Sequence, residues 1–292
     1  MKKVQKAVIP AAGLGTRMLP ISAAVPKEML PIVDLPAVYH LVEEAVLSGI
    51  PDVLIITNRG KGAMEDFFDL SPEYIAALQE KGRTDDLRRM REIAEMANVT
   101  FLRQRETRGL GHAVARARAF VGNEPFAVLY GDDIMFAEKP VTAQLIAAYE
   151  AYGRSVAAVK PVPPALLQKY CSLKVEPIAG DERAFLCTDM IEKPKPGQEF
   201  SNLAILGRVL LEPRVFDILD ELPPGAGGEI QLTDAMAILA RNGGMTALDY
   251  EGERFDLGSK LGFLTANVTR GVSHPEVGEA FTAWLKEFVR GL

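Results

Sequence analysis

The stretch Ala7-Val8-Ile9-Pro10-Ala11-Ala12-Gly13-Leu14-Gly15-Thr16-Arg17 decides the fold, because it joins a predicted strand at 7–9 to a glycine-rich loop. Two glycines separated by one residue let the backbone turn sharply and bring its N–H groups close to phosphate oxygens. Arg17 adds a planar, permanently charged guanidinium that suits the same oxygens. A Gly-x-Gly loop alone is typical of an ordinary strand–loop turn. The Thr16-Arg17 continuation and the later Pro26-Lys27 favour a nucleotide phosphate site.

The loop matches neither of two common phosphate-binding motifs. It lacks the Gly-Lys-Ser/Thr ending of a P-loop, and Met18 stands where the dinucleotide fingerprint has its third glycine. No helical pattern follows before Pro20. A nicotinamide-dependent dehydrogenase, which the order of strands and helices alone would allow, is therefore disfavoured.

Apolar strands alternate with helical patterns through the first 165 residues. The predicted strands are 7–9, 53–57, 99–102, 126–130 and 156–162, and the predicted helices are 36–48, 72–97 with an interruption at Gly82, 111–120 and 141–152. Buried strands separated by helices predict an α/β fold with a mostly parallel central sheet flanked by helices.

After residue 165 the strand patterns lie closer together, which predicts a small β-rich part. Strands are expected at 169–176, 184–191 and 203–210, and helices at 213–220, 229–241 and 275–290. The last helix has an apolar face, so we expect it to dock on its own core or on a second subunit. No long linker interrupts the chain. We therefore predict a single domain, 1–292, with C-terminal helices at 258–292.

Composition narrows the class of protein. Hydrophobic residues make up 48% and charged residues 25%, which excludes a disordered chain. The net charge of -6 argues against a nucleic-acid-binding protein with a diffuse basic surface. Two cysteines without metal-ligand spacing argue against zinc and suit a reducing compartment. No run of 18 apolar residues predicts a membrane span, so we expect a cytoplasmic protein.

Asp132 follows the predicted strand 126–130 and is a candidate metal ligand. Ligands bind at the carboxyl ends of strands in open parallel sheets. Mg²⁺ prefers one or two carboxylates completed by phosphates and water. An aspartate-rich turn is the plain alternative for Gly131-Asp132-Asp133, and the position at a strand end favours metal.

A set of ordered motifs identifies a family. The chain resembles the sugar-1-phosphate nucleotidyltransferases and, within them, the bacterial UTP–glucose-1-phosphate uridylyltransferases. The motifs that carry this resemblance span nearly the whole chain: Gly13–Arg17, Pro26-Lys27-Glu28-Met29-Leu30-Pro31, Gln104 with Gly109–Ala113, Glu192-Lys193-Pro194, Ser201–Ile205, Gly207-Arg208, Pro223–Gly227, Glu229–Ala235 and Phe255–Gly262. The resemblance implies a Rossmann-like nucleotide-diphospho-sugar transferase fold. It also implies a nucleotide-binding part at 1–165 and a sugar-binding part at 166–257, followed by the C-terminal helices at 258–292.

The resemblance also implies a reaction in which a sugar 1-phosphate attacks the α-phosphorus of UTP in line and pyrophosphate leaves. The nucleophile is already an anion, so the protein must mainly align two anions and neutralise charge. Arg17, Lys27 and Lys193 match catalytic positions. The nucleotide-binding positions implied are Ala11, Ala12, Gly13, Gly15, Thr16, Gln104 and Gly109. The Gln104 amide can pair with the imide edge that uracil and thymine share.

The remaining implied sites are for sugar and metal. Glu192, Lys193 and Asn202 match sugar-binding positions, and Asp132 and Asp256 match Mg²⁺ ligands. His112 matches a structural position at the start of a helix, and we assign no catalytic role to any histidine. Two departures stand out. Ala23 replaces a frequent lysine, and Tyr170-Cys171-Ser172-Leu173 replaces Tyr-Gly-Val-Val in the sugar pocket.

Several alternatives remain open at this point. Another sugar 1-phosphate or dTTP would use the same chemistry, and the departures near Cys171 make glucose less secure than nucleotidyl transfer. A non-catalytic regulator that binds a nucleotide sugar is a different class. Retention of the charged phosphate and metal positions argues against it. The resemblance further suggests a homodimer or homotetramer without nucleic-acid or membrane partners.

Overall fold

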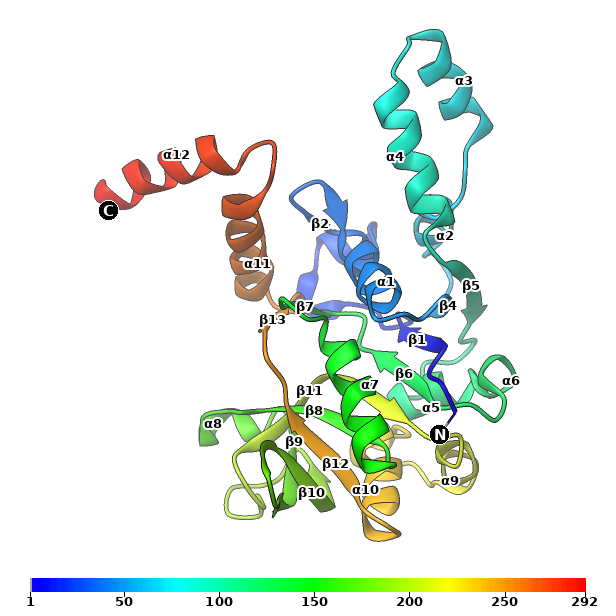
Figure 1. The fold of residues 1–292 in the computed structure, drawn as a ribbon, viewed down its shortest axis with the longest axis vertical. Helices are drawn as coiled ribbons and strands as arrows, with labels where there is room; N and C mark the ends of the chain where they lie inside the picture. The colour runs from blue at the N-terminus through cyan, green and yellow to red at the C-terminus, as the bar shows by residue number, and fades with distance from the viewer. Residues whose placement is uncertain (1) are drawn as a thin grey trace.

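The computed structural model describes residues 2–292, and a nine-stranded sheet forms its centre (Figure 1). Its strand order is β5-β4-β1-β6-β11-β8-β12-β10-β9, and two short two-strand sheets pair β13 with β7 and β2 with β3. The strands are β1 Lys6–Pro10, β2 Pro31–Ile32, β3 Leu35–Pro36, β4 Asp52–Thr57, β5 Asn98–Arg103, β6 Phe126–Leu129, β7 Asp133–Phe136, β8 Val156–Pro161, β9 Cys171–Ile178, β10 Asp181–Glu192, β11 Leu203–Leu211, β12 Met245–Asp249 and β13 Glu253–Asp256.

The mostly parallel sheet that the sequence predicts is confirmed, with two strands reversed. β5, β4, β1 and β6 are parallel neighbours, as are β8 and β12. β11 is antiparallel to β6 and β8, and β10 is antiparallel to β12 and β9. The connection from β9 to β10 is only Ala179-Gly180, which is too short for a parallel crossover. One sheet thus runs through both the 1–165 and the 166–257 parts.

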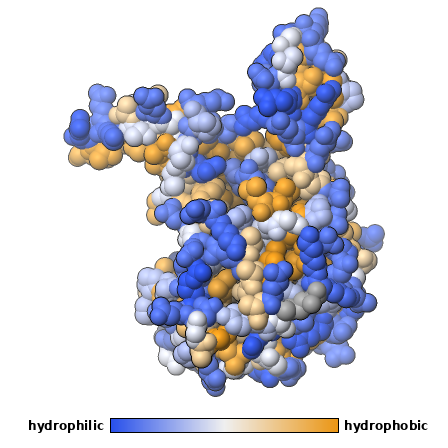
Figure 2. Space-filling view, viewed as in Figure 1, coloured by the Kyte–Doolittle hydropathy of each residue, from blue (hydrophilic) through white to orange (hydrophobic). Residues whose placement is uncertain are grey.

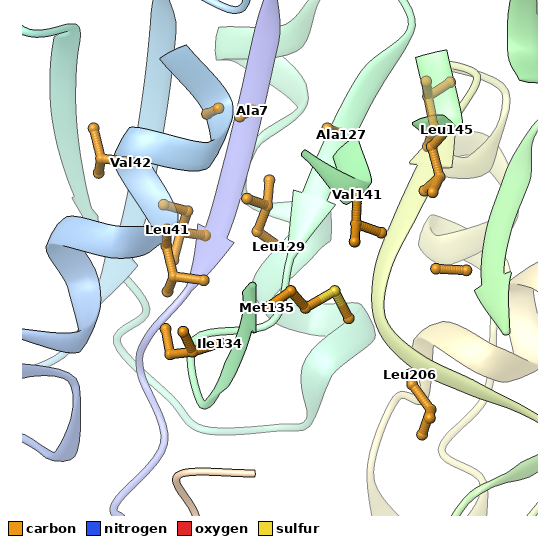
Figure 3. Close-up of a cluster of buried hydrophobic side chains, with 14 of the residues drawn as sticks. Ala7, Leu41, Val42, Ala127, Leu129, Ile134, Met135, Val141, Leu145 and Leu206 are labelled. Atoms are coloured by element: carbon orange, nitrogen blue, oxygen red, sulfur yellow. The ribbon is translucent and has the colours of Figure 1, made fainter. Parts of the chain in front are cut away.

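The central strands are buried on both faces, which explains their unbroken apolar sequence. Ala7 and Ile9 of β1 face one apolar cluster and Val8 faces the other, as the two-residue period of a strand requires. Helices α1 and α7 cover the first face (Figure 3). Helices α5, α9 and α10 cover the second.

The helices confirm most of the predicted positions and correct two. They are α1 Ala37–Leu47, α2 Ala63–Phe67, α3 Pro72–Glu80, α4 Thr84–Glu95, α5 Leu110–Ala115, α6 Arg118–Val121, α7 Val141–Tyr152, α8 Pro164–Leu167, α9 Val215–Glu221, α10 Leu232–Arg241, α11 Lys260–Ser273 and α12 Gly278–Arg290. The predicted helix 111–120 is split into α5 and α6. The predicted helix 229–241 begins only at Leu232, because residues 229–231 are extended. None of the helices in residues 2–292 is long and apolar enough to cross a membrane.

Two helical segments project from the body (Figure 1). One is the hairpin of α3 and α4, and the other is α12, which extends away from α11 toward the C-terminus. Phe281, Trp284 and Phe288 form a stacked row along α12, with ring centroids 5.8 and 5.2 Å apart. Trp284 is 54% exposed and Phe288 51%. Figure 2 shows apolar atoms along one side of this projecting arm.

A buried ion pair fixes α1 and α7 to the middle of the sheet. Arg208 on β11 is 1% exposed, and its guanidinium donates to both carboxylate oxygens of Glu44 on α1, the shortest contact being 2.7 Å. The backbone N–H and hydroxyl of Thr142 on α7 also donate to Glu44, at 3.0 and 2.6 Å. The hydrogen bonds from both partners compensate the loss of hydration of the two charges.

Candidate active site

The candidate site lies where β1, β4 and β6 end, since parallel strands place their carboxyl ends at one edge of the sheet. Two hollows meet there, of about 820 and 380 Å³, and Leu110 lines both. Of the residues expected to bind substrates or metal, Arg17, Asp132, Glu192 and Asp256 line the larger hollow. Ala12, Gly13, Gly15, Thr16, Lys27, Gln104 and Gly109 line the smaller one.

The backbone of the glycine-rich loop turns at Gly15, as its two glycines predict. Gly15 has a left-handed backbone with φ of 68°, and its carbonyl accepts a 2.8 Å hydrogen bond from the Ser22 hydroxyl. Thr16–Met18 then form a single 3₁₀ turn that carries Arg17 into the cleft. Ala11 lies beneath the loop and is buried, so it can contribute only through its backbone.

Lys61 supports this loop from below, and sequence reasoning did not find it. Its ammonium donates to the carbonyl of Ala11 and forms a 2.8 Å ion pair with Glu28. Both side chains are buried. Burial raises the pKa of Glu28, and Lys61 and Lys27 partly oppose that shift. Glu28 therefore forms its ion pair with Lys61, a residue 33 positions further along the chain. The sequence feature that could have pointed to Lys61 is its place between Gly60 and Gly62, shortly after β4.

Lys27 and Arg17 converge on Asp132. The Lys27 ammonium lies 2.7 Å from Oδ2 of Asp132, and the Arg17 guanidinium lies 3.4 Å from the same oxygen. Burial acts to raise the pKa of Asp132, but Lys27 and Arg17 outweigh it, so the pKa ends below the usual aspartate value. Burial likewise acts to lower the pKa of Lys27, but Asp132 and Glu28 outweigh it and the pKa is raised. The carboxylate and the ammonium are both charged at neutral pH.

Asp256 lies beside Asp132 and shares Arg17 with it. Oδ2 of Asp256 is 3.4 Å from the other terminal nitrogen of Arg17, and Oδ1 accepts a 2.8 Å hydrogen bond from the N–H of Gly258. A side chain at Gly258 would collide with the Arg17 guanidinium, so glycine is needed for this arrangement. Two carboxylates that face one cation suit Mg²⁺. No cluster of three or more His, Cys, Asp or Glu residues occurs within residues 2–292, so substrate oxygens would complete such a site.

Gln104 is held in a fixed orientation beside the loop that contains Gly109. Its Nε2 is 2.8 Å from Nδ1 of His112 and 3.4 Å from the carbonyl of Gly109. Burial, Arg108 and Arg116 lower the pKa of His112, so this histidine is neutral and accepts the hydrogen bond at Nδ1. His112 thus has the structural role that the sequence predicts. The amide oxygen of Gln104 is left to accept a hydrogen bond, which fits the N3–H of uracil or thymine.

Backbone hydrogen bonds join the segment 229–231 to the loop that contains Gly109, which explains the extended backbone of the segment. The N–H of Gly111 donates to the carbonyl of Ile230 at 2.8 Å, and the N–H of Ile230 donates to the carbonyl of Arg108 at 2.8 Å. Gly109 has φ of 102°, and a Cβ there would lie 2.7 Å from the Ile230 carbonyl oxygen. The loop that contains Gly109 therefore needs glycine at this position, and its conformation depends on backbone hydrogen bonds with the segment 229–231.

The sugar-binding predictions are only partly brought together. Glu192 lines the larger hollow and accepts a 2.9 Å hydrogen bond from the Thr233 hydroxyl. Lys193 lies 3.7 Å from Glu192 and has a left-handed backbone with φ of 46°. Asn202 is exposed, and neither it nor Lys193 lines the hollow. Their contacts with a sugar phosphate stay predictions.

Ser172, where the family usually has valine, anchors the turn before Asn202. Its hydroxyl accepts from the N–H groups of Phe200 and Ser201 at 3.0 and 3.1 Å and donates to the Ser201 carbonyl at 2.8 Å. Ser201 in turn donates its hydroxyl to the carbonyl of Leu173 at 2.7 Å. Cys171 lines the hollow opposite Glu192 in the β9–β10 register. Cys171 therefore faces the hollow, whereas Ser172 is buried and acts on the turn that leads to Asn202.

A phosphate loop, two converging cations and a pair of carboxylates at strand ends define a nucleotidyl-transferring site, and the chain belongs to the nucleotidyl transferase family, whose model matches residues 6–270. A UTP–glucose-1-phosphate uridylyltransferase 2 of Staphylococcus saprophyticus is 46% identical over 98% of this chain and 99% of its own length.

Solved structures agree with this family. A UTP-bound UDP-glucose pyrophosphorylase from Acinetobacter baumannii has a TM-score of 0.90 and 36% identity, covering 97% of this chain and 99% of that one. A UDP-glucose pyrophosphorylase in complex with UDP-glucose has a TM-score of 0.83 and 38% identity, covering 91% and 98%. The nucleotide-diphospho-sugar transferase fold inferred from the motifs is confirmed.

Proposed function

We propose that this chain transfers the uridylyl group of UTP to glucose 1-phosphate, giving UDP-glucose and pyrophosphate. The observation that carries the proposal is the convergence of Arg17 and Lys27 on Asp132, between the Gln104 loop and Glu192. A cleft with a base-binding end, a cationic centre and a carboxylate at its far end matches a nucleotide joined to a sugar phosphate. The relatives described above support UTP and glucose 1-phosphate as the pair.

The residues of the cleft would act mainly by alignment and charge neutralisation. The triphosphate would accept hydrogen bonds from the backbone N–H groups of Gly13, Gly15 and Thr16. Arg17 would bind its terminal phosphates. Lys27 lies where charge develops on the α-phosphate, and Lys193 would hold the incoming sugar phosphate beside it. No general base is required, because the attacking oxygen is already an anion.

We further propose Mg²⁺ as the cofactor, held by Asp132 and Asp256. When bound, Mg²⁺ would neutralise phosphate charge and fix the geometry of the triphosphate. Support comes from the two carboxylates that share Arg17, and from the preference of Mg²⁺ for a few carboxylates plus phosphate oxygens. Excess chelator should abolish pyrophosphate release, and added Mg²⁺ should restore it. Undiminished turnover in chelator would contradict the metal proposal.

Pyrophosphate release across a matrix of nucleoside triphosphates and sugar 1-phosphates tests the activity. We expect UTP with glucose 1-phosphate to give the highest kcat/KM. Preference for dTTP, or for another sugar 1-phosphate, would replace the substrate pair and keep the reaction class. Binding of UDP-glucose without turnover of any pair would contradict the enzyme proposal and favour a regulator.

We also propose a cytoplasmic homo-oligomer that uses the exposed face of α12. Two free, buried cysteines support a reducing compartment. The exposed aromatic row of α12 supports an interface, because large apolar patches on a surface commonly mark contacts with another protein. Light scattering after size exclusion should give a dimer or tetramer for the wild type. Trp284→Glu should shift it toward the monomer, whereas Tyr74→Glu, at an exposed aromatic of α3, should leave it unchanged.

A further inference from the structure

Arg254 lies in the cleft and makes contacts that none of the expected site residues explains. It belongs to β13, two residues before Asp256, and its guanidinium lies 2.6 Å from Oδ1 of Asp133. The same guanidinium stacks over the ring of Tyr170 at 5.3 Å and donates to its hydroxyl at 3.3 Å. All three side chains line the larger hollow. Arg254 therefore links Asp133, at the start of β7, to Tyr170, immediately before β9.

Asp133 is a further carboxylate in the larger hollow, and Arg254 is its cationic partner. It is 3% exposed, follows Asp132 directly and lines the hollow that would hold a triphosphate and a sugar phosphate. Its Oδ1 lies 2.6 Å from the Arg254 guanidinium, so the two side chains form an ion pair. An unpaired second carboxylate there would repel an incoming phosphate. The ion pair with Arg254 cancels that charge.

Tyr170 extends the effect of Arg254 to the sugar side. The carbonyl of Tyr170 accepts a 2.9 Å hydrogen bond from the N–H of Lys193, whose backbone is left-handed. The guanidinium fixes the Tyr170 ring by stacking and by a hydrogen bond. A displaced ring would also displace the backbone that positions Lys193. Two independent contacts of Arg254 thus bear on the place where a sugar phosphate would lie.

We propose that Arg254 is a positioning residue for the sugar 1-phosphate subsite, which neutralises Asp133 and holds Tyr170 in place beside Lys193. The inference rests on the proposed transferase function, and it adds a residue outside the phosphate, base and metal motifs. The UTP subsite should depend on Arg254 far less, because Gln104 and the glycine-rich loop lie in the other hollow.

Steady-state pyrophosphate release by the full-length protein tests this assignment with each substrate varied in turn. Arg254→Met should raise KM for glucose 1-phosphate about tenfold, the effect of losing one charged hydrogen bond, and change KM for UTP less than about twofold. Arg254→Lys, which keeps the charge but not the planar fork, should give a smaller rise. Tyr170→Phe isolates the hydroxyl contact and should also raise only KM for glucose 1-phosphate.

The double variant Arg254→Met/Asp133→Asn separates charge from fold. It should recover part of the lost glucose 1-phosphate affinity, because the unpaired carboxylate is gone. Arg183→Met is the matched control, since Arg183 forms a 2.7 Å ion pair with Glu251 on the exposed surface and should leave both KM values unchanged. Equal rises in both KM values, or none, in Arg254→Met, Arg254→Lys and Tyr170→Phe would overturn the positioning role while wild-type turnover upheld the function. A wild type without turnover on any sugar 1-phosphate would overturn both.

Discussion

Asp132 makes close contacts with two cations, and this arrangement shows how single residues share the work of the cleft. Lys27 and Arg17 reach it from two different 3₁₀ turns of the segment after β1, and β6 ends just before Asp132. Under the proposed function, the same cations would contact phosphate oxygens once the carboxylate held Mg²⁺. Each side chain would then have an ionic partner both before and after substrate binds.

We predict that Asp132→Asn lowers turnover far more than stability. The amide keeps the volume but cannot supply the negative charge that a metal needs, so kcat should fall by at least about 10²-fold. The free energy of unfolding should fall by no more than about 2 kcal/mol, for loss of one partly buried charged contact. Kinetics at limiting Mg²⁺ measure kcat, and urea denaturation measures the free energy of unfolding. Near-normal turnover at limiting Mg²⁺ would rule Asp132 out as the ligand.

Lys193→Ala should separate the two substrates. We expect a higher KM for the sugar 1-phosphate and a lower kcat, because alignment and charge screening are both lost. UTP binding measured by calorimetry should be nearly unchanged, since Arg17 and Gln104 remain. Lys195→Ala, two residues further along an exposed turn, is the control. An equal loss of UTP affinity would place Lys193 in the nucleotide subsite.

Single residues differed in how well sequence predicted them. Arg17 and Asp132 were found because each belongs to a local motif at a strand end. Glu28 with Lys61 and Asp133 with Arg254 were not found as pairs, because each is formed by segments that only the folded sheet brings together. A charged residue in a sequence does not reveal its partner, and the partner decides its role.

At the scale of elements, short segments held by hydrogen bonds to distant loops were harder to predict than the regular helices and strands. The sequence placed the β1–α1–β4 order and α7 well, because their apolar periods are long and regular. It extended α10 back to residue 229, since Glu229-Ile230-Gln231 continues the helical pattern. Ile230 donates its N–H to the carbonyl of Arg108 and accepts from the N–H of Gly111; these hydrogen bonds hold the segment extended, and no local pattern could predict them. The sequence also missed β12, and it gave no separate bounds for α11 within the C-terminal helices expected at 258–292.

Gly207 in β11 provides a test at this scale. It has φ of 69°, and a Cβ there would lie 2.8 Å from Cβ of Asp133. Gly207→Ala should lower the free energy of unfolding by about 2–4 kcal/mol, from backbone strain plus overpacking. Gly180→Ala, with φ of 84° but open space around it, should lose only about 1–2 kcal/mol. Equal losses in urea unfolding would mean that the contact with Asp133 carries no constraint.

At the scale of the whole molecule, one sheet carries both hollows. The smaller hollow lies where strands of the 1–165 part end, and β9, β10 and β11 contribute residues to the larger hollow. Under the proposed function, one sheet would therefore serve both substrates. The reversed strand β11 joins the halves, and its Arg208 is tied to Glu44 on α1. Relative motion of the halves is therefore limited by the sheet itself.

Breaking the buried ion pair between Glu44 and Arg208 should destabilise the entire chain. Glu44→Ala leaves Arg208 buried without its carboxylate, so the free energy of unfolding should fall by about 3–5 kcal/mol. Asp86→Ala, which breaks an exposed pair with Arg83, should change it by no more than about 1 kcal/mol. Urea denaturation followed by circular dichroism measures both. Comparable losses in the two variants would mean that burial gives the Glu44–Arg208 pair no special weight.

The chain has one tryptophan, and it lies in the exposed aromatic row of α12. Its fluorescence is therefore a built-in reporter on that helix. If copies of the chain meet through α12, the emission maximum should shift to the blue with rising protein concentration, and acrylamide should quench it less. Adding UTP should leave the spectrum unchanged, because Trp284 lines neither substrate hollow. A spectrum independent of concentration across the range where the mass changes would place the contact elsewhere.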